Sequence, residues 1–196
     1  GESVVLRVLD RSSVNLALET LGMPAETIAY ILEVIEKPNG IFIVTGPTGS
    51  GKTTTLYSCL RKINTSDSKL LTAEDPVEYD LPGISQTQIN LRAGMTFARG
   101  LRAILRQDPD VILIGEIRTQ ETMEHALAFA ETGHLCLFTL HANNANQALD
   151  RIINFFTEER HKQLFHDLSL NLRGFVSQRL IPTIDGEIRR RRHAYL

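Results

Sequence analysis

Eight consecutive residues near position 50 form a glycine-rich segment that ends in a lysine and a threonine. The segment runs Gly46, Pro47, Thr48, Gly49, Ser50, Gly51, Lys52 and Thr53 and matches the pattern G-x-x-x-x-G-K-[ST] in full. Such glycines let backbone N–H groups converge on phosphate oxygens, and a helix that begins there directs positive charge at the same point. We therefore expect Lys52 to reach the β- and γ-phosphates of a nucleotide and the Thr53 hydroxyl to ligate Mg²⁺, with Thr54 beside them.

Two other segments supply carboxylates. Glu116 comes just after the apolar run Val111–Ile114, and Glu74 and Glu78 follow a second strand-like run. In a parallel sheet the carboxyl ends of the strands meet the ligand, so these acids are expected beside the phosphate loop. Hydrolysis needs an acid for the metal and a group that positions water. Glu116 is the candidate for the first role, and Glu74 or Glu78 for the second. The alternative is that these acids lie in solvated turns.

Two histidines flank a third apolar run, and three arginines lie near the Glu116 strand. His141 follows the run 135–140, which places it at the same sheet edge as Glu116. His134 precedes that run and should lie at the opposite end, unless the turn folds back.

The arginines are Arg102, Arg106 and Arg118. The first two are four apart on one predicted helical face, and Arg118 follows Glu116 by two residues. They could clamp a γ-phosphate within one subunit or from a neighbouring one. Pairing with nearby acids on the surface is an equally good interpretation.

Alternating strand and helix patterns must position these residues. Unbroken apolar runs at 41–44, 111–114 and 135–138 are typical of strands buried on both faces of a parallel sheet. Helical spacing predicts helices at 24–37, 52–63, 96–106 and 120–131, the last capped by Thr119. Three more helices are expected at 144–156, 158–168 and 170–180, and a terminal strand at 187–196. The predicted fold class is α/β, a doubly wound sheet with right-handed crossovers.

The two ends of the chain look different from this core. Residues 3–9 predict an isolated strand, which cannot be stable alone and so would belong to a neighbouring domain. The predicted division is 1–12 for that strand and its linker and 13–196 for the main domain. The basic run Arg189–Arg192 is best explained as a solvated edge strand that avoids pairing with other chains, rather than a nucleic-acid or membrane contact.

Composition excludes several classes of protein. With 196 residues, 42% of them hydrophobic, the chain can bury a core and is not disordered. Its net charge of −2 provides no field that would attract nucleic acid or an anionic membrane. Cys59 and Cys136 are too few for a four-cysteine zinc site and are expected to be buried thiols. No segment is typical of a signal peptide or membrane helix, which favours a cytoplasmic location.

Taken together and in this order, the motifs closely resemble the secretion ATPase superfamily, the motors of type II secretion and type IV pili. The resemblance runs from residue 1 to about 180 and covers four boxes: the Walker A loop 46–53, an aspartate box 72–79, a Walker B segment 112–118 and a histidine box 132–141. Residues 74–118 are more similar to type II secretion and pilus-extension ATPases. Residues 121–180 are more similar to pilus-retraction ATPases.

The resemblance implies a RecA-like, ATP-hydrolysing domain that uses Mg²⁺ and assembles into a homo-hexamer. It implies that Glu116 serves the Mg²⁺ and water site and that an aspartate-box glutamate assists as base. Arg7 and the three arginines above would line the nucleotide site or couple neighbouring domains. The expected partner is an inner-membrane platform protein of a pilus or secretion machine, which places the motor at the cytoplasmic face of that membrane. The tetracysteine zinc insertion usual in type II secretion and pilus-extension ATPases is missing.

Two other functions stay open from the sequence. One is a nucleotide-binding assembly subunit with little turnover, which ATP-dependent hexamer formation without phosphate release would support. The other is a small-molecule P-loop kinase, although no lid for an acceptor is evident. A nucleic-acid motor shares the same core but finds little support in the charge.

Overall fold

The computed structural model describes residues 17–181 and, for the backbone alone, 191–195. The predicted strand at 3–9, its linker and Arg7 lie outside the described residues. So do Arg189, Arg190 and the proposed domain boundary at residue 12.

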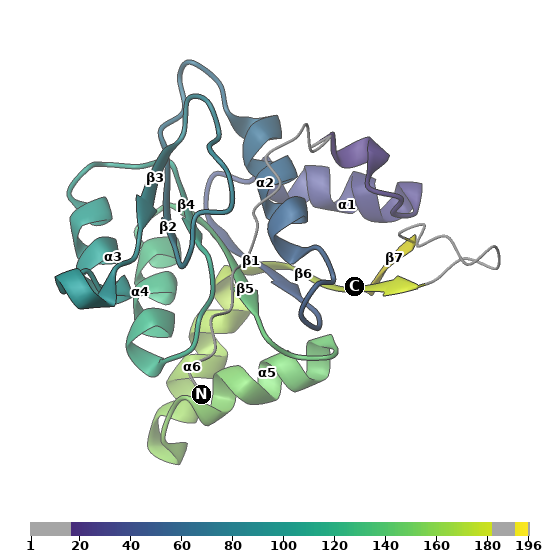
Figure 1. Cartoon of the computed structure of the whole chain (residues 1–196). Helices are drawn as coiled ribbons and strands as arrows, with labels where there is room; N and C mark the ends of the chain where they lie inside the picture. Colours follow the sequence, from purple (N-terminus) through teal and green to yellow (C-terminus); the bar gives the residue numbers. More distant parts are fainter. Residues whose placement is uncertain (1–16, 182–190, 196) are drawn as a thin grey trace, which may run out of the picture.

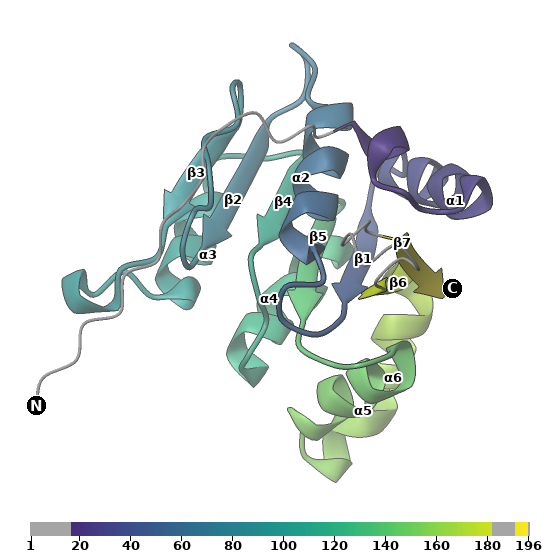
Figure 2. The ribbon, with the colours of Figure 1, turned by 45° about the vertical axis from the view of Figure 1, so that its right-hand side comes forward.

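A seven-stranded sheet forms the centre of the molecule, in the order β3-β2-β4-β5-β1-β6-β7 (Figure 2). Its first six strands pair in parallel, and β7 pairs antiparallel with β6. The strands are β1 (Gly40–Thr45), β2 (Leu70–Glu74), β3 (Ser85–Gln88), β4 (Val111–Ile114), β5 (Leu135–Leu140), β6 (Leu172–Ile181) and β7 (Arg191–Tyr195). The three apolar runs are thus strands as predicted, and β5 separates β1 from β4.

Helices cover both faces of this sheet, which confirms the predicted α/β class (Figure 1). They are α1 (Ala25–Ile35), α2 (Lys52–Ile63), α3 (Phe97–Leu105), α4 (Gln120–Glu131), α5 (Ala145–Asn154) and α6 (Glu158–Asn171), with short 3₁₀ turns η1 (Leu18–Thr20) and η2 (Leu91–Ala93). The Thr119 side chain caps α4 as expected, by accepting a hydrogen bond from the Thr122 N–H.

Alternating side chains of the central strand feed two hydrophobic clusters. Ile41 and Ile43 of β1 pack with α3, α4, α5 and α6 on one face. Phe42 and Val44 pack with η1, α1 and α2 on the other. Because a strand's side chains alternate between faces, a strand buried on both sides must be apolar throughout. This explains why periodicity located β1, β4 and β5 correctly.

The predicted helix at 170–180 is wrong, because residues 172–181 form β6 beside β1. Phe175 and Val176 point to opposite clusters, as strand residues do and helix residues need not. Gly174 lies so close to β1 that a Cβ there would approach the Phe42 ring to 2.9 Å. The sheet thus needs a strand without a side chain at this point.

The two cysteines are both buried and unpaired, as predicted. Burial raises the pKa of the Cys59 thiol to about 12 and also raises that of Cys136, because a thiolate loses its hydration there. In the described part of the chain, no helix combines the length and apolar character needed to cross a bilayer.

Candidate functional site

The glycine-rich segment connects β1 to α2 at the carboxyl edge of the sheet. Gly46, Gly49 and Gly51 have φ angles of 148°, 77° and 86°, a backbone region that residues other than glycine rarely adopt. Gly51 is also the N-cap of α2. The backbone therefore turns tightly enough for successive N–H groups to face one point ahead of the helix, which is the geometry of an anion-binding nest.

Lys52 is held against this loop. Its side chain is buried, with 9% exposure, and its Nζ donates hydrogen bonds to the carbonyls of Gly46 (2.9 Å) and Pro47 (3.0 Å). Burial lowers the pKa of Lys52, and the negative charge of Glu116 partly opposes that effect. A cation held in a fixed place at the mouth of the loop suits contact with phosphate.

Glu116 lies across the pocket from the loop, at the end of β4. Its side chain is 14% exposed, and Arg118 donates to its Oε2 through Nε (2.7 Å) and Nη2 (2.6 Å). His141 Nε2 lies 3.6 Å from Glu116 Oε1, which confirms the predicted placement of His141 at this edge. Burial lowers the pKa of His141, and so do Lys52 and nearby arginines, whereas Glu116 raises it. A neutral imidazole beside the carboxylate is thus favoured.

The strand order explains how these groups meet. Because β5 lies between β1 and β4, its last residues lie between the phosphate loop and Glu116. The Thr139 hydroxyl donates to the Gly115 carbonyl (2.6 Å), which ties β5 to the turn that carries Glu116. Gly115 itself leaves little room for a side chain, since a Cβ there would lie 3.3 Å from the Glu74 Cα.

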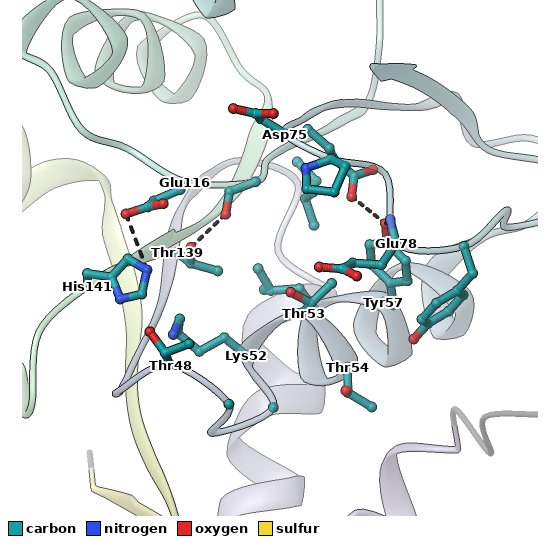
Figure 3. A pocket seen from close by; sticks show the side chains of 18 of the residues that line it. Thr48, Lys52, Thr53, Thr54, Tyr57, Asp75, Glu78, Glu116, Thr139 and His141 are labelled. Carbon is teal, nitrogen blue, oxygen red and sulfur yellow. Dashed lines mark hydrogen bonds and ion pairs between the residues drawn. The ribbon is translucent and has the colours of Figure 1, made fainter. Parts of the chain in front are cut away.

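The acidic segment 74–80, which begins at the last residue of β2, forms the opposite rim, and its two glutamates differ. Glu74 is 2% exposed, and its carboxylate accepts hydrogen bonds from Tyr57, Thr72 (2.6 Å) and Gln86 (3.2 Å). Burial and the Glu74 charge raise the pKa of Tyr57 above its ordinary range, so Tyr57 remains a donor. Glu78 is half-buried and extends into the pocket (Figure 3).

A pocket of about 710 Å³ joins the two rims. Figure 3 shows Glu116 and His141 on one side of it, Tyr57 and Glu78 on the other, and Thr53 between them. The residues predicted for the site that line it are Thr48, Gly49, Gly51, Lys52, Thr53, Thr54, Glu74, Glu78, Glu116, Arg118 and His141. Most of the residues that the sequence predicts for the site therefore line one pocket in the folded chain.

Gly46, Pro47 and Ser50 belong to the loop but do not line this pocket, and two of the predicted arginines lie elsewhere, as does His134. Arg102 and Arg106 are exposed on and just after α3 and are not among the residues that line this pocket. His134 lies at the amino edge of the sheet, as expected, where its Nδ1 is 3.0 Å from both the Thr132 hydroxyl and the Phe129 carbonyl. These contacts hold His134 against the end of α4 and the turn before β5.

Sequence reasoning missed several residues that shape the site. Tyr57 and Gln86 hold Glu74, and Gln178 of β6 bonds to the loop from behind. Gln86 lies on β3, a strand that the sequence did not reveal because Ser85–Gln88 contains no apolar residue. Gln178 gives no such signal either, because Ser177 and Arg179 on each side of it are also polar.

The residues present fit a nucleotide and its metal ion. A Cβ on Gly49 would meet no described atom within 4 Å, so the loop opens into the pocket at that point. Mg²⁺ takes oxygen ligands and is usually held by one or two protein groups together with substrate phosphates. The Thr53 hydroxyl and the Glu116 carboxylate, which line the same pocket, match that donor set.

Comparison with known proteins adds the family. Residues 1–194 match the family described as type II/IV secretion system protein. The chain belongs to this family. Type II secretion system protein E of Pectobacterium carotovorum subsp. carotovorum is 52% identical over 184 residues, covering 94% of this chain and 36% of that protein. Type II secretion system ATPase E of Vibrio cholerae is 49% identical over 184 residues, 94% of this chain and 35% of that protein. The chain thus spans little more than a third of these relatives.

Among solved structures, the pilus retraction motor PilT with bound ADP superimposes with a TM-score of 0.78. The two chains are 41% identical, and the match covers 91% of this chain and 51% of the PilT chain. With a phosphate loop after β1 and a sheet in this strand order, the fold is the RecA-like P-loop fold that the sequence predicted.

Proposed function

We propose that this chain is the ATP-hydrolysing part of a motor that powers type II protein secretion or type IV pilus movement. One observation carries the proposal: the phosphate loop, Glu116 and the acidic segment at the end of β2 surround a single pocket at the carboxyl edge of the sheet. The family and the relatives named above support the same conclusion. Since the chain spans only part of those relatives, the activity of the whole protein belongs to this proposal.

In this proposal the chain's residues bind and orient the nucleotide. The loop N–H groups and Lys52 hold the phosphates, and Thr53 and Glu116 hold Mg²⁺. When bound, Mg²⁺ neutralises charge that develops on the phosphates. Phosphoryl transfer needs little beyond such positioning and charge neutralisation. The pairing of Glu116 with Arg118 and His141 would fix its orientation toward the metal and the attacking water.

Glu78 is the better candidate for the base that positions this water. Both glutamates line the pocket, but Glu78 is half-buried, whereas Glu74 is almost fully buried and its carboxylate already accepts hydrogen bonds from three side chains. A base must be free to accept a proton from water. Glu74 would then act indirectly, because it holds Tyr57, whose hydroxyl in turn lies 3.3 Å from the Glu78 backbone nitrogen.

The assembly is proposed to be a homo-hexamer on an inner-membrane platform protein. In such an assembly Arg102 and Arg106 would act on a neighbouring subunit, because both are exposed and lie outside this chain's own pocket. The relatives favour type II secretion over pilus retraction: identity to the secretion proteins reaches 52%, against 41% to PilT. A position at the cytoplasmic face of the inner membrane follows from that assignment.

Phosphate release by the full-length protein that carries this chain tests the proposal. The native protein with ATP and Mg²⁺ should release phosphate, and Lys52→Ala should abolish that release. His134→Ala is the matched control, because His134 lies at the opposite edge of the sheet and should leave turnover unchanged. ATP-dependent oligomer formation without phosphate release would instead support an assembly subunit.

A further inference from the structure

One buried amide contacts the phosphate loop from near the far end of the chain. Gln178 of β6 has no exposed surface. Its Nε2 donates to the carbonyl of Ser50 (2.7 Å), and its Oε1 accepts from the hydroxyl of Thr55 (2.8 Å). The Gln178 backbone carbonyl also packs against Gly46, since a Cβ on that glycine would collide with it. One residue thus touches the loop at its start, near its end and in the helix that follows.

The Ser50 carbonyl takes its hydrogen bond from Gln178, whereas other carbonyls of the loop find donors close by in the sequence. The carbonyls of Gly46 and Pro47 accept from Lys52, and that of Gly51 accepts from the Thr55 N–H (3.0 Å). Those partners all lie within the loop or the first turn of α2. The partner of Ser50 comes from a strand 128 residues further along the chain.

The direction of that carbonyl decides what the loop can bind. An anion-binding nest works because its N–H groups face the anion and its carbonyls face away. A carbonyl oxygen turned toward a phosphate would oppose binding, because both carry negative charge. The amide of Gln178 supplies the donor that keeps the Ser50 carbonyl on the side facing β6.

We propose that Gln178 is a positioning residue of the phosphate loop, which sets the loop's affinity for nucleotide by holding the Ser50 carbonyl and the Thr55 hydroxyl. The inference rests on the nucleotide binding proposed above and adds a residue from the C-terminal third of the chain. Gln178 acts through the loop and does not touch the nucleotide.

The chemistry of the site calls for an amide. Gln178 must donate to a carbonyl and accept from a hydroxyl at the same time, and a primary amide does both. Leucine has a similar volume and does neither. A glutamate can reproduce both contacts while it is protonated, but as a carboxylate it has no proton to donate to Ser50.

The first experiment compares two buried amides. Binding of ATP with Mg²⁺ to the native protein, Gln178→Leu and Asn171→Leu is measured by calorimetry, together with thermal unfolding. Asn171 is a buried amide that donates to the Asp167 carbonyl (2.9 Å), away from the loop. An unpaired buried group costs enough to predict roughly tenfold weaker ATP binding for Gln178→Leu. Asn171→Leu should lose stability but keep native affinity.

The second experiment uses Gln178→Glu and a pH series. Burial raises the pKa of a carboxyl group, so the introduced acid is neutral at low pH. The ratio of its Kd for ATP to the native Kd should stay near one at low pH and rise as the carboxyl ionises. A residue that only filled space would give a ratio independent of pH. Expressing the result as a ratio removes the titration of ATP itself and of native groups.

The outcomes separate this inference from the proposed function. If the native protein binds ATP and Gln178→Leu binds it equally well, or the Gln178→Glu ratio is flat, the positioning role is wrong while nucleotide binding stands. If the native protein binds ATP no better than Lys52→Ala, the proposed function itself fails and this inference fails with it. Thr55→Val should weaken binding and add little to Gln178→Leu, since both remove one network.

Discussion

The two rims of the pocket position their functional atoms by different means. On the phosphate loop, residues 46–53, the backbone does most of the positioning: three glycines at positive φ turn the chain, and Lys52 bonds to the loop's own carbonyls. On the acidic rim, residues 74–80, side chains from other elements do it. Glu74 is fixed by Tyr57 of α2 and Gln86 of β3, whereas Glu78 is not enclosed in this way.

The difference shows which kinds of site a sequence can reveal. A backbone nest requires glycine at fixed spacings, so the residue types themselves report it. An acidic rim requires only carboxylates, and their roles depend on which neighbours the fold brings. Glu74 and Glu78 look equivalent in the sequence, and both line the pocket, yet Glu74 is buried in a hydrogen-bond network and Glu78 is only half-buried.

The strongest test of the comparison separates binding from turnover. Lys52→Ala should remove ATP binding, because the loop loses its cation. Glu116→Gln should keep ATP binding, which the loop and Lys52 supply, but lower turnover about 100-fold or more, since it removes a charge that orients Mg²⁺ and the attacking water. Calorimetry and phosphate release on both variants check this. Native turnover in Glu116→Gln would remove Glu116 from the proposed mechanism.

Substitutions of the two glutamates of the acidic rim should have different effects, one on stability and the other on turnover. Glu74→Leu leaves the donors of Tyr57, Thr72 and Gln86 without their acceptor, which should cost about 3 kcal/mol of unfolding free energy. Glu78→Gln should leave that free energy unchanged and lower turnover instead. Urea unfolding and phosphate release are measured on the same preparations. Equal losses of stability would mean that the two side chains share one structural role.

Glycines of the loop offer a smaller, graded test. Gly46→Ala should destabilise the protein by about 2 kcal/mol or more, because the new Cβ would collide with the Gln178 carbonyl and with the buried Ser50 hydroxyl. Gly49→Ala meets open space, so only its positive φ opposes the change, at about 1 kcal/mol. Thermal unfolding ranks the pair. The reverse order would show that the loop is not held from behind by β6.

Most of the sheet could be predicted from the sequence because it is buried on both faces. Continuous apolar runs identify β1, β4 and β5, and parallel pairing predicts that His141 lies at the same sheet edge as Glu116; that the two side chains meet follows from the strand order, which the sequence does not give. The same logic fails at the sheet's edge. Among the strands of the described residues, β3 has a neighbour on one side alone, so Ser85–Gln88 can be polar and gives no periodic signal.

The sequence pattern wrongly predicts a helix at β6 for a different physical reason. It begins at Leu172, directly after α6, so no turn residue separates the two elements. Its apolar residues also fit a helical period, and nothing local reveals that Gly174 must pack against β1. The contact of Gln178 with the loop was lost with that error, because a residue's partners follow from its strand. Tertiary contacts, and not the local preference for helix or strand, determine both the strand β6 and the contact of Gln178 with the loop.

The smallest effect concerns His141, which lies beside Glu116 on the side of the pocket away from Glu78 (Figure 3). Its pKa in the folded chain is lowered, first by burial and then by Lys52, Arg118 and Arg151, against the opposing charge of Glu116. Below about pH 6.5 the unfolded chain therefore binds a proton at His141 that the folded chain does not, and stability falls as pH falls through that window. The effect is small because the side chain is 40% exposed and solvent screens it.

His141→Gln should accordingly lose less stability than the native protein between pH 7.5 and pH 5.5, measured by urea unfolding. The exposed His166→Gln is the control and should follow the native curve. If both variants respond to pH as the native protein does, then protonation of His141 costs the fold nothing. The pKa of His141 would in that case be the same in the folded and the unfolded chain.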